Sequence, residues 1–141
     1  MIEFEEKYFK EFNFSKNQVD KFMEAASKDL EIAKGNDCPE VRFQFSYNSL
    51  IKIGIALVAC YNRKVSSRVG HHQKILEKME EILKDKDIFT HGDKMRKTRN
   101  KDLYDGGMMI SFKQAESYLS FVEDACLLSQ NFIKKHFNTM L

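Results

Sequence analysis

The fold is decided by one nearly unbroken apolar stretch, Phe45-Ser-Tyr-Asn-Ser-Leu-Ile-Lys-Ile-Gly-Ile-Ala-Leu-Val-Ala-Cys-Tyr61. Its apolar residues keep helical spacing and extend almost all the way round the helix, leaving a narrow polar edge near Asn48 and Lys52. Other helices must enclose such a helix, so it is predicted to form the centre of a bundle. We expect it to begin at Asp37-Cys-Pro39, since Pro is favoured in a first turn and Asp can cap it, and to run to about Val65.

Gly54 in this central helix has two interpretations. It permits a neighbouring helix to approach closely, or it is a tolerated glycine that costs about 1 kcal/mol relative to Ala. The sequence favours neither.

Four further helices are predicted around this centre by apolar residues at helical spacing. Two begin with a capping box, Ser15 with Gln18 and Ser111 with Gln114, and Gly35 is expected to end the first in a left-handed conformation. The charged face of the helix over 70–84 is predicted to be solvated and paired within itself. The predicted helix ranges are 16–34, 70–84, 88–104 and 112–137. A loop is expected at 85–87, and Gly106-Gly107 is expected to end the helix before it. Residues 2–12 are predicted to form either a short amphipathic helix or an N-terminal arm.

Length and composition agree with an all-α, up-and-down bundle of about five helices in a single domain, residues 1–141. One Pro and six Gly leave few breaks, which suits long helices better than the many turns of a sandwich or barrel. The formal net charge of +2 is too small to indicate nucleic-acid binding by itself, so any basic signal has to be local.

The sequence also indicates where in the cell the protein is found and which kinds of chemical site it lacks. Three cysteines without a CxxC or Cys/His cluster indicate reduced thiols rather than a disulfide framework or a zinc site. The longest apolar run, Ile53–Tyr61, is far short of the roughly 20 residues that span a bilayer, and no signal peptide is visible. Common enzyme motifs are absent from the sequence. We therefore expect a cytoplasmic protein that has no membrane contact, metal or cofactor.

Two segments carry candidate functional groups, and the first is Gly70-His71-His72-Gln73 at the start of a helix. Ile75 and Leu76 follow the histidines by four residues, which places both imidazoles on or beside the core-facing stripe. There they could bind an anion or hold a catalytic proton. Alternatively, they pack and hydrogen-bond at the edge of the core. Adjacent side chains diverge by about 100° on a helix, so the pair is a poor metal site.

The second segment is Lys94-Met-Arg96-Lys-Thr-Arg99-Asn100-Lys101, which holds five cations and no acid. On a helix it places Arg96, Arg99 and Asn100 on the packing face, where polar groups need partners. Arginine's planar fork suits carboxylates or phosphates. One interpretation is a contact surface for phosphate or RNA backbone, which two subunits could share. The other is an internal network of ion pairs and hydrogen bonds with three nearby residues, Asp102, Tyr104 and Asp105.

Three motifs of the chain occur together: Phe45-Ser-Tyr47-Asn-Ser-Leu50, Gly70-His71-His72-Gln73, and Arg96-Lys-Thr-Arg99-Asn100-Lys-Asp-Leu-Tyr104-Asp105 before a long final helix. In these motifs the chain, from roughly Phe45 to Phe132, resembles the HEPN family, the higher eukaryotes and prokaryotes nucleotide-binding domain. This resemblance implies a small α-helical bundle, commonly dimeric, of prokaryotic toxin–antitoxin and defence systems. In the active branch it implies metal-independent RNA cleavage by an Arg, a following polar residue and a His four to six positions after the Arg.

Arg99-Asn100 matches the first half of that family motif. Tyr104, Asp105 and Gly106 occupy the positions where the His would fall. Cleavage needs a group that moves protons near neutral pH, which His does readily and which Tyr or Asp does only with a large pKa shift. We therefore expect a domain that is non-catalytic or weakly catalytic.

Three hypotheses for function follow. The leading one is a homodimeric HEPN-like domain that binds RNA, a nucleotide or a partner protein through a basic face. The second is a metal-independent endoribonuclease in which His71 or His72 joins Arg99 and Asn100 as catalytic residues. The third is a structural adaptor for a nucleotidyltransferase partner, as some HEPN-like proteins are. The binding residues assigned to the leading hypothesis are Arg96, Arg99, Asn100, Lys101, Tyr104 and Asp105.

Overall fold

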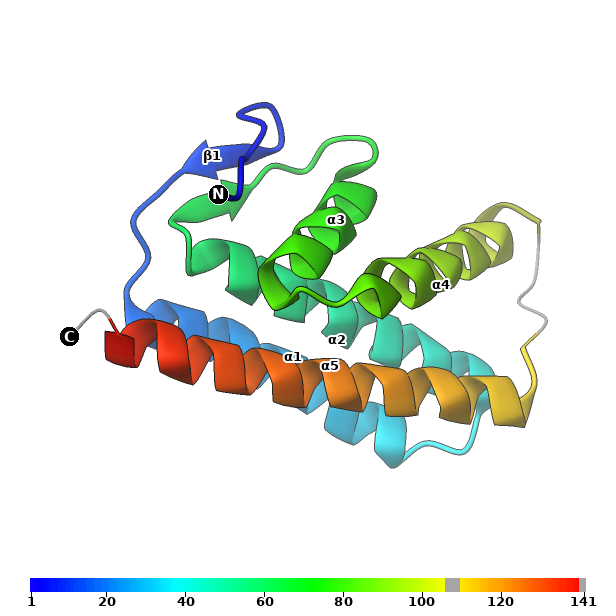
Figure 1. The fold of residues 1–141 in the computed structure, drawn as a ribbon. Coiled ribbons are helices and arrows are strands. Elements are labelled where there is room, and N and C mark those ends of the chain that lie inside the picture. Colours follow the sequence, from blue (N-terminus) through cyan, green and yellow to red (C-terminus); the bar gives the residue numbers. More distant parts are fainter. Residues whose placement is uncertain (106–109, 140–141) are drawn as a thin grey trace.

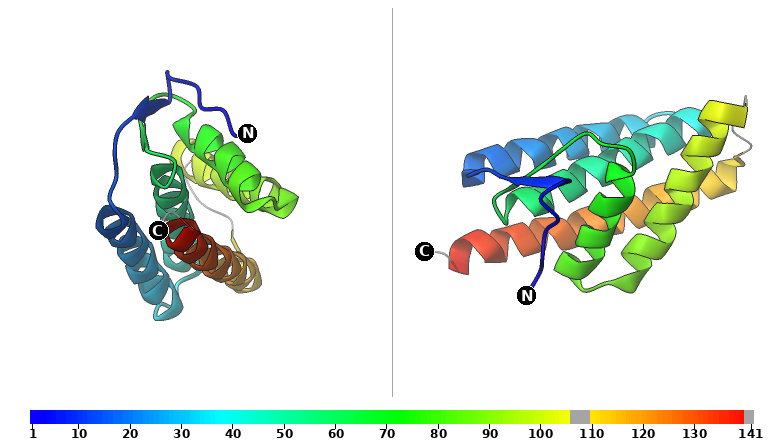
Figure 2. Two further views of the ribbon diagram at one scale, coloured as in Figure 1. Left: turned by 60° about the vertical axis from the view of Figure 1, so that its left-hand side comes forward. Right: turned by 90° about the horizontal axis from the view of Figure 1, so that it is seen from above.

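The computed structural model describes residues 1–105 and 110–139, with side chains up to Lys101 in the first range. The prediction of an all-α bundle is confirmed, because five helices make up most of the described residues. The helices α1, α2 and α5 lie side by side, and α3 and α4 form a hairpin that covers α2 (Figures 1 and 2). The elements in chain order are β1 (Phe9–Glu11), α1 (Lys16–Lys34), α2 (Pro39–Ala59), β2 (Arg63–Val65), α3 (His71–Leu83), α4 (Lys86–Asp105) and α5 (Phe112–Thr139).

Helix α2 is the centre of the bundle, as predicted, because it packs against α1, α3, α4 and α5. Its side chains Tyr47 and Leu50 have no exposed surface. Gly54 is a position of close approach, since a Cβ there would lie 2.2 Å from Cγ2 of Ile75 and 2.9 Å from Sδ of Met79. The backbone of α2 therefore touches α3 directly, which fixes where α3 and its N-terminal histidines lie.

The predicted end of α2 near Val65 is wrong, because the helix ends at Ala59. Asn62 adopts a left-handed φ of 57°, and its N–H donates to the carbonyl of Ala59 at 2.9 Å. Asn tolerates this conformation better than most residues, so the chain leaves the helix in a turn at this point. It continues as β2, which pairs antiparallel with β1 in a small ribbon that the helical pattern does not predict.

Both predicted capping boxes are present. At the start of α5, for example, Ser111 Oγ accepts from the N–H of Gln114 at 3.0 Å, and Gln114 Oε1 accepts from the N–H of Ser111 at 2.9 Å. Two other end signals are wrong: Gly35 has a φ of −84° rather than a left-handed one, and Cys38, not Asp37, is the N-cap of α2. The remaining helices differ from their predicted ranges at their ends, and the predicted glycine stop at 106–107 lies outside the described residues.

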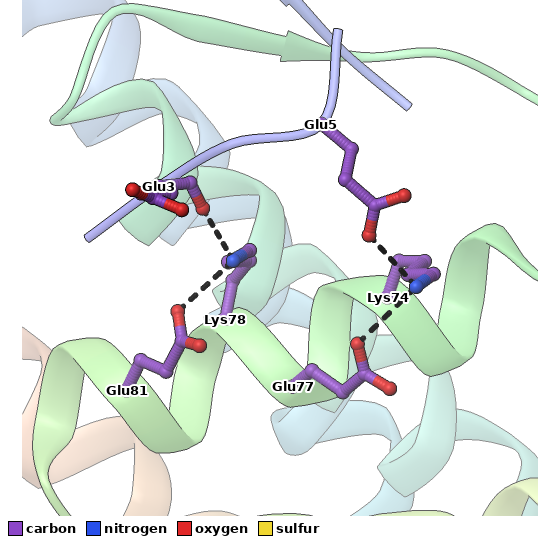
Figure 3. Close-up of polar contacts among 6 residues, drawn as sticks. All are labelled: Glu3, Glu5, Lys74, Glu77, Lys78 and Glu81. Carbon is purple, nitrogen blue, oxygen red and sulfur yellow. Dashed lines mark hydrogen bonds and ion pairs between the residues drawn. The ribbon is translucent and has the colours of Figure 1, made fainter. Parts of the chain in front are cut away.

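Residues 1–14 form an arm rather than a helix, and this arm is fastened to α3 by two lysines (Figure 3). Lys74 Nζ lies 2.8 Å from Glu5 Oε1. Lys78 Nζ donates to the backbone carbonyl of Glu3. Lys78 is only 8% exposed, so the predicted solvation of this charged face is wrong at that residue. The predicted pairing within the helix is confirmed, since Lys74 Nζ lies 3.7 Å from Glu77 Oε2 and Lys78 Nζ lies 3.0 Å from Glu81 Oε2. The arm covers part of that face and adds Glu5 and the Glu3 carbonyl as partners of the two ammonium groups.

Within the described ranges, no helix is both long and apolar enough to cross a membrane. The three cysteines are free thiols, with Cys38 exposed and Cys60 and Cys126 buried. Burial raises the pKa of the Cys60 thiol to about 12, so this thiol stays protonated and unreactive at neutral pH.

Candidate functional site

Side chains from three helices meet where the start of α3 and the middle of α4 cross α2. We call this group the Tyr47 cluster. The histidines and arginines that the sequence singled out in separate segments therefore lie on one part of the surface. The members are Tyr47 from α2, His71 and His72 from α3, and Asp93, Arg96 and Arg99 from α4.

Two glycines explain why the three helices meet here. Gly70 precedes α3 with a φ of +83°, a conformation that residues with a Cβ rarely adopt, and it turns the chain into the helix. Gly92 lets α4 approach closely, because a Cβ there would lie 2.7 Å from Cδ2 of Leu76 on α3 and 3.4 Å from Cδ2 of Leu50 on α2. The basic segment of α4 is thus held against both helices.

Tyr47 and His72 form the centre of the cluster. Tyr47 Oη lies 2.8 Å from Nδ1 of His72, a hydrogen bond between α2 and α3. Burial raises the pKa of Tyr47, so the phenol stays protonated. Burial and the neighbouring charges of His71, Arg99 and Arg96 lower the pKa of His72 from 6.5 to about 4. Both partners are therefore neutral at pH 7.

Arg99 reaches this centre from α4. Its guanidinium carbon lies 5.7 Å from the centre of the Tyr47 ring, within the range of a cation–π interaction. The positive charge of Arg99 is also among the causes that lower the pKa of His72. One half-buried cation thus lies close to a neutral imidazole and to a phenol.

Arg96 and Lys97 share a carboxylate that sequence reasoning missed. Asp93 Oδ1 accepts from Arg96 Nε at 2.7 Å, and its Oδ2 lies 3.3 Å from Lys97 Nζ. Burial would raise the pKa of Asp93, but the hydrogen bonds from Arg96 and Lys97 outweigh burial and hold that pKa below its usual range. An acid one helical turn before an Arg is a known signal for an ion pair, and it was available in the sequence.

The structural interpretation of the two histidines is confirmed, since both make hydrogen bonds at the edge of the core. His71 Nδ1 lies 2.7 Å from the carbonyl oxygen of Arg68, and the two imidazole rings are 4.4 Å apart, edge to face. Their predicted role toward an anion or a proton stays a prediction. In the described part of the chain, no three His, Cys, Asp or Glu side chains gather as a metal-binding group.

The other predicted site residues lie along α4 beyond this centre. Asn100 is half-buried next to Arg99, and Lys101 is exposed. The side chains of Tyr104 and Asp105 lie outside the described residues, so their predicted part in the site stays a prediction. The side chain of Asp102 also lies outside the described residues, so the internal network with Asp102, Tyr104 and Asp105 stays a prediction. Within the described residues, Arg96 pairs with Asp93.

No protein-family model, curated protein or solved structure matches this chain. Its chemistry is therefore argued from the cluster itself. A basic helix face bears a guanidinium oriented by an aromatic ring, beside an uncharged imidazole that can gain a proton. Such a set of groups can bind a phosphate by charge and by hydrogen bonds, and can take up a proton when it does so.

The lowered pKa of His72 predicts how stability depends on pH. The unfolded chain binds a proton on this ring near pH 6.5, whereas the folded chain does so only near pH 4. The free energy of unfolding should therefore fall as the pH is lowered from about 6.5 toward 4. His72→Gln keeps a hydrogen-bonding partner for Tyr47 and should flatten that fall, as measured by urea unfolding at several pH values. An unchanged pH dependence in this variant would show that the ring is protonated as easily in the folded chain.

Proposed function

We propose that the Tyr47 cluster binds phosphate groups of RNA or of a nucleotide, in a domain of HEPN-like type. One observation carries the proposal: the guanidinium of Arg99 rests on the ring of Tyr47 beside His72, so that groups from three helices converge. The cation–π contact orients the planar fork before a ligand arrives, and an oriented fork loses less entropy on binding a phosphate.

The local charge supports an anionic ligand. Residues 93–101 contain five cations and one carboxylate, and that carboxylate is shared by Arg96 and Lys97. The neutral state of His72 adds a group that can donate or accept a hydrogen bond without repelling the neighbouring cations. Burial, together with the neighbouring positive charges, keeps this ring neutral, and an arriving phosphate would offset those charges and so raise the pKa of His72.

Binding to wild-type protein tests the proposal. The protein should bind a short fluorescein-labelled single-stranded RNA, with an affinity that falls as salt rises, by a slope of about 0.7 for each phosphate contact. Competition by a nucleoside monophosphate would assign the site to nucleotides, and its absence would assign the site to an extended RNA backbone. Failure to bind both the RNA and the mononucleotide would overturn the proposal.

Ribonuclease activity is a second candidate, and the position of His72 favours it. The family motif histidine is missing from its usual place, but His72 brings an imidazole from α3 to the same aromatic ring that Arg99 contacts. In this proposal Arg99 neutralises the charge of the scissile phosphate, and His72, which is neutral at pH 7, accepts the proton as a general base.

This second candidate makes a separate prediction. If wild-type protein cleaves RNA in the presence of EDTA, His72→Gln should slow cleavage by about 100-fold or more, because general acid–base groups contribute at least that factor. His71→Gln, purified in the same way, serves as the matched control, since His71 points to the carbonyl of Arg68. Cleavage at the wild-type rate by the His72 variant would exclude this mechanism.

The homodimer and the protein partner remain predictions from the resemblance. Helices of the same chain cover the apolar surface of α2, so this surface is not free to form a dimer contact. Any subunit contact would therefore involve other surfaces, such as the exposed side of α4.

A further inference from the structure

The ribbon of β1 and β2 places two lysines directly opposite each other. Its register pairs Phe9 with Val65 and Lys10 with Lys64. Side chains of opposed residues lie on the same face, so Phe9 enters the core while both lysines are exposed on the outer face. Like charges directly opposite each other destabilise a ribbon by electrostatic repulsion. An anion bound between the two lysines would reduce this repulsion.

An exposed aromatic ring continues this outer face. Phe12 is 44% exposed, and Lys64 Nζ lies 5.4 Å from the centre of its ring. The ring of Phe14 is 4.7 Å from that of Phe12. Next to them is a hollow of about 380 Å³, and its mainly apolar lining includes Phe12, Phe14, Phe22, Ile55, Lys64 and Val65.

Asn62 fixes the position of the segment that carries Phe12 and Phe14. Its backbone carbonyl accepts from the N–H of Phe12 at 3.1 Å, and its side-chain Oδ1 accepts from the N–H of Phe14 at 3.0 Å. The same left-handed turn that ends α2 therefore also orders the segment that carries the exposed ring. A surface that is ordered in advance loses less entropy when a ligand binds to it.

We propose that this ribbon is a second binding site, which takes a single-stranded nucleic acid by stacking a base on Phe12 and holding a phosphate at Lys10 and Lys64. Aromatic rings next to cations are the usual means of binding single strands. A membrane surface is the other partner with apolar and anionic parts. It fits less well because, of the apolar side chains that line the hollow, only Phe12 is exposed, whereas Phe14, Phe22, Ile55 and Val65 are partly buried. None of the residues belongs to the Tyr47 cluster, so the site stands independently of the function proposed above.

A fluorescence experiment tests the stacking directly, because the chain contains no Trp. Phe12→Trp introduces a single indole, and a short unlabelled single-stranded RNA should quench its emission as a base stacks on it. Phe112→Trp is the matched control, since Phe112 is similarly exposed, at 51%, but begins α5. Circular dichroism confirms that both variants fold.

Two further measurements sharpen the result. Phe12→Ala should weaken RNA affinity about tenfold while Phe12→Tyr keeps it, and Lys10→Gln or Lys64→Gln should each lower the salt slope by about 0.7. No quenching in Phe12→Trp, or equal quenching in both Trp variants, would overturn the proposal. A blue shift with vesicles of phosphatidylserine and phosphatidylcholine, without quenching by RNA, would overturn it in favour of a membrane surface.

The double variant Phe12→Trp with Arg99→Ala separates this site from the Tyr47 cluster. Quenching that survives in the double variant supports a ribbon site that does not depend on the cluster. Quenching that is lost with Arg99 would show that the ribbon does not bind RNA on its own, and would overturn the second site while leaving the first.

Discussion

Gly54→Ala should lower the free energy of unfolding by about 2 kcal/mol or more. The added Cβ would lie 2.2 Å from Cγ2 of Ile75, so α3 has to move away from α2. Overpacking of a core typically costs about 1 to 3 kcal/mol and occasionally more. We expect the upper end of this range here, because the clashing methyl group is attached to Cβ of a branched side chain, which has few alternative rotamers on a helix. The higher helix propensity of Ala offsets about 1 kcal/mol of that cost. Urea unfolding followed by circular dichroism measures the net change.

Gly35→Ala is the matched control for this experiment. The nearest atom to a Cβ at Gly35 is the carbonyl oxygen of Glu31 at 3.5 Å, an ordinary contact, and the φ of −84° suits Ala. We expect little change or a small gain in stability. Ile75→Ala in the Gly54→Ala background should cost less than the sum of the two single changes, because it removes the clashing atom. If Gly54→Ala were as stable as the wild type, the close contact between α2 and α3 would be wrong.

Arg99→Ala should weaken RNA or nucleotide binding by about tenfold to a hundredfold. An arginine that binds a phosphate through two hydrogen bonds contributes about 1.5 to 3 kcal/mol, and its loss should also lower the salt slope by about 0.7. Arg99→Lys should restore only part of the affinity, because Lys supplies the charge without the planar fork. Lys86→Ala removes the same charge at the opposite end of α4 and is expected to leave binding nearly unchanged.

The same Arg99→Ala sample separates binding from stability. The contact with the Tyr47 ring is worth about 0.5 to 1 kcal/mol at a partly exposed site, so the melting temperature should fall only slightly. A large fall in melting temperature, together with a wild-type protein that binds no RNA, would show that Arg99 serves only to hold α4 in place. Melting temperature and affinity measured on one preparation therefore decide between the two roles.

The parts of the fold that depend on neighbouring residues in the chain were predictable. The box of Ser15 and Gln18 and the apolar spacing after it predict α1 with the bounds that the structure has. The ribbon was not predictable, because Phe9 and Val65 lie 56 positions apart in the chain and neither strand has a pattern of its own. The apolar residues keep helical spacing through Tyr61, so the periodicity predicts a continuing helix and gives no sign of the turn at Asn62.

The same distinction holds for the candidate site. Its basic segment and its histidines stand out locally, and both were found. The role of Tyr47 was not, since its place in the apolar stripe of α2 predicts only burial. Its hydroxyl meets His72 because α3 packs on α2 at Gly54, a contact between distant parts of the chain. A side chain within a buried apolar stripe carries no local sign that its polar end contacts another helix.

The arm has a consequence for the order in which the protein assembles during synthesis. Glu5 and Glu3 leave the ribosome before their partners Lys74 and Lys78, which lie 69 and 75 residues further along the chain. Until β2 has emerged, β1 has no strand to pair with, and until α3 has emerged, the arm lacks its two lysine partners. Contacts of such long range form slowly, so the arm should dock after the helices have packed. During that interval an unpaired strand with an aromatic side chain is open to chaperones and to other nascent chains.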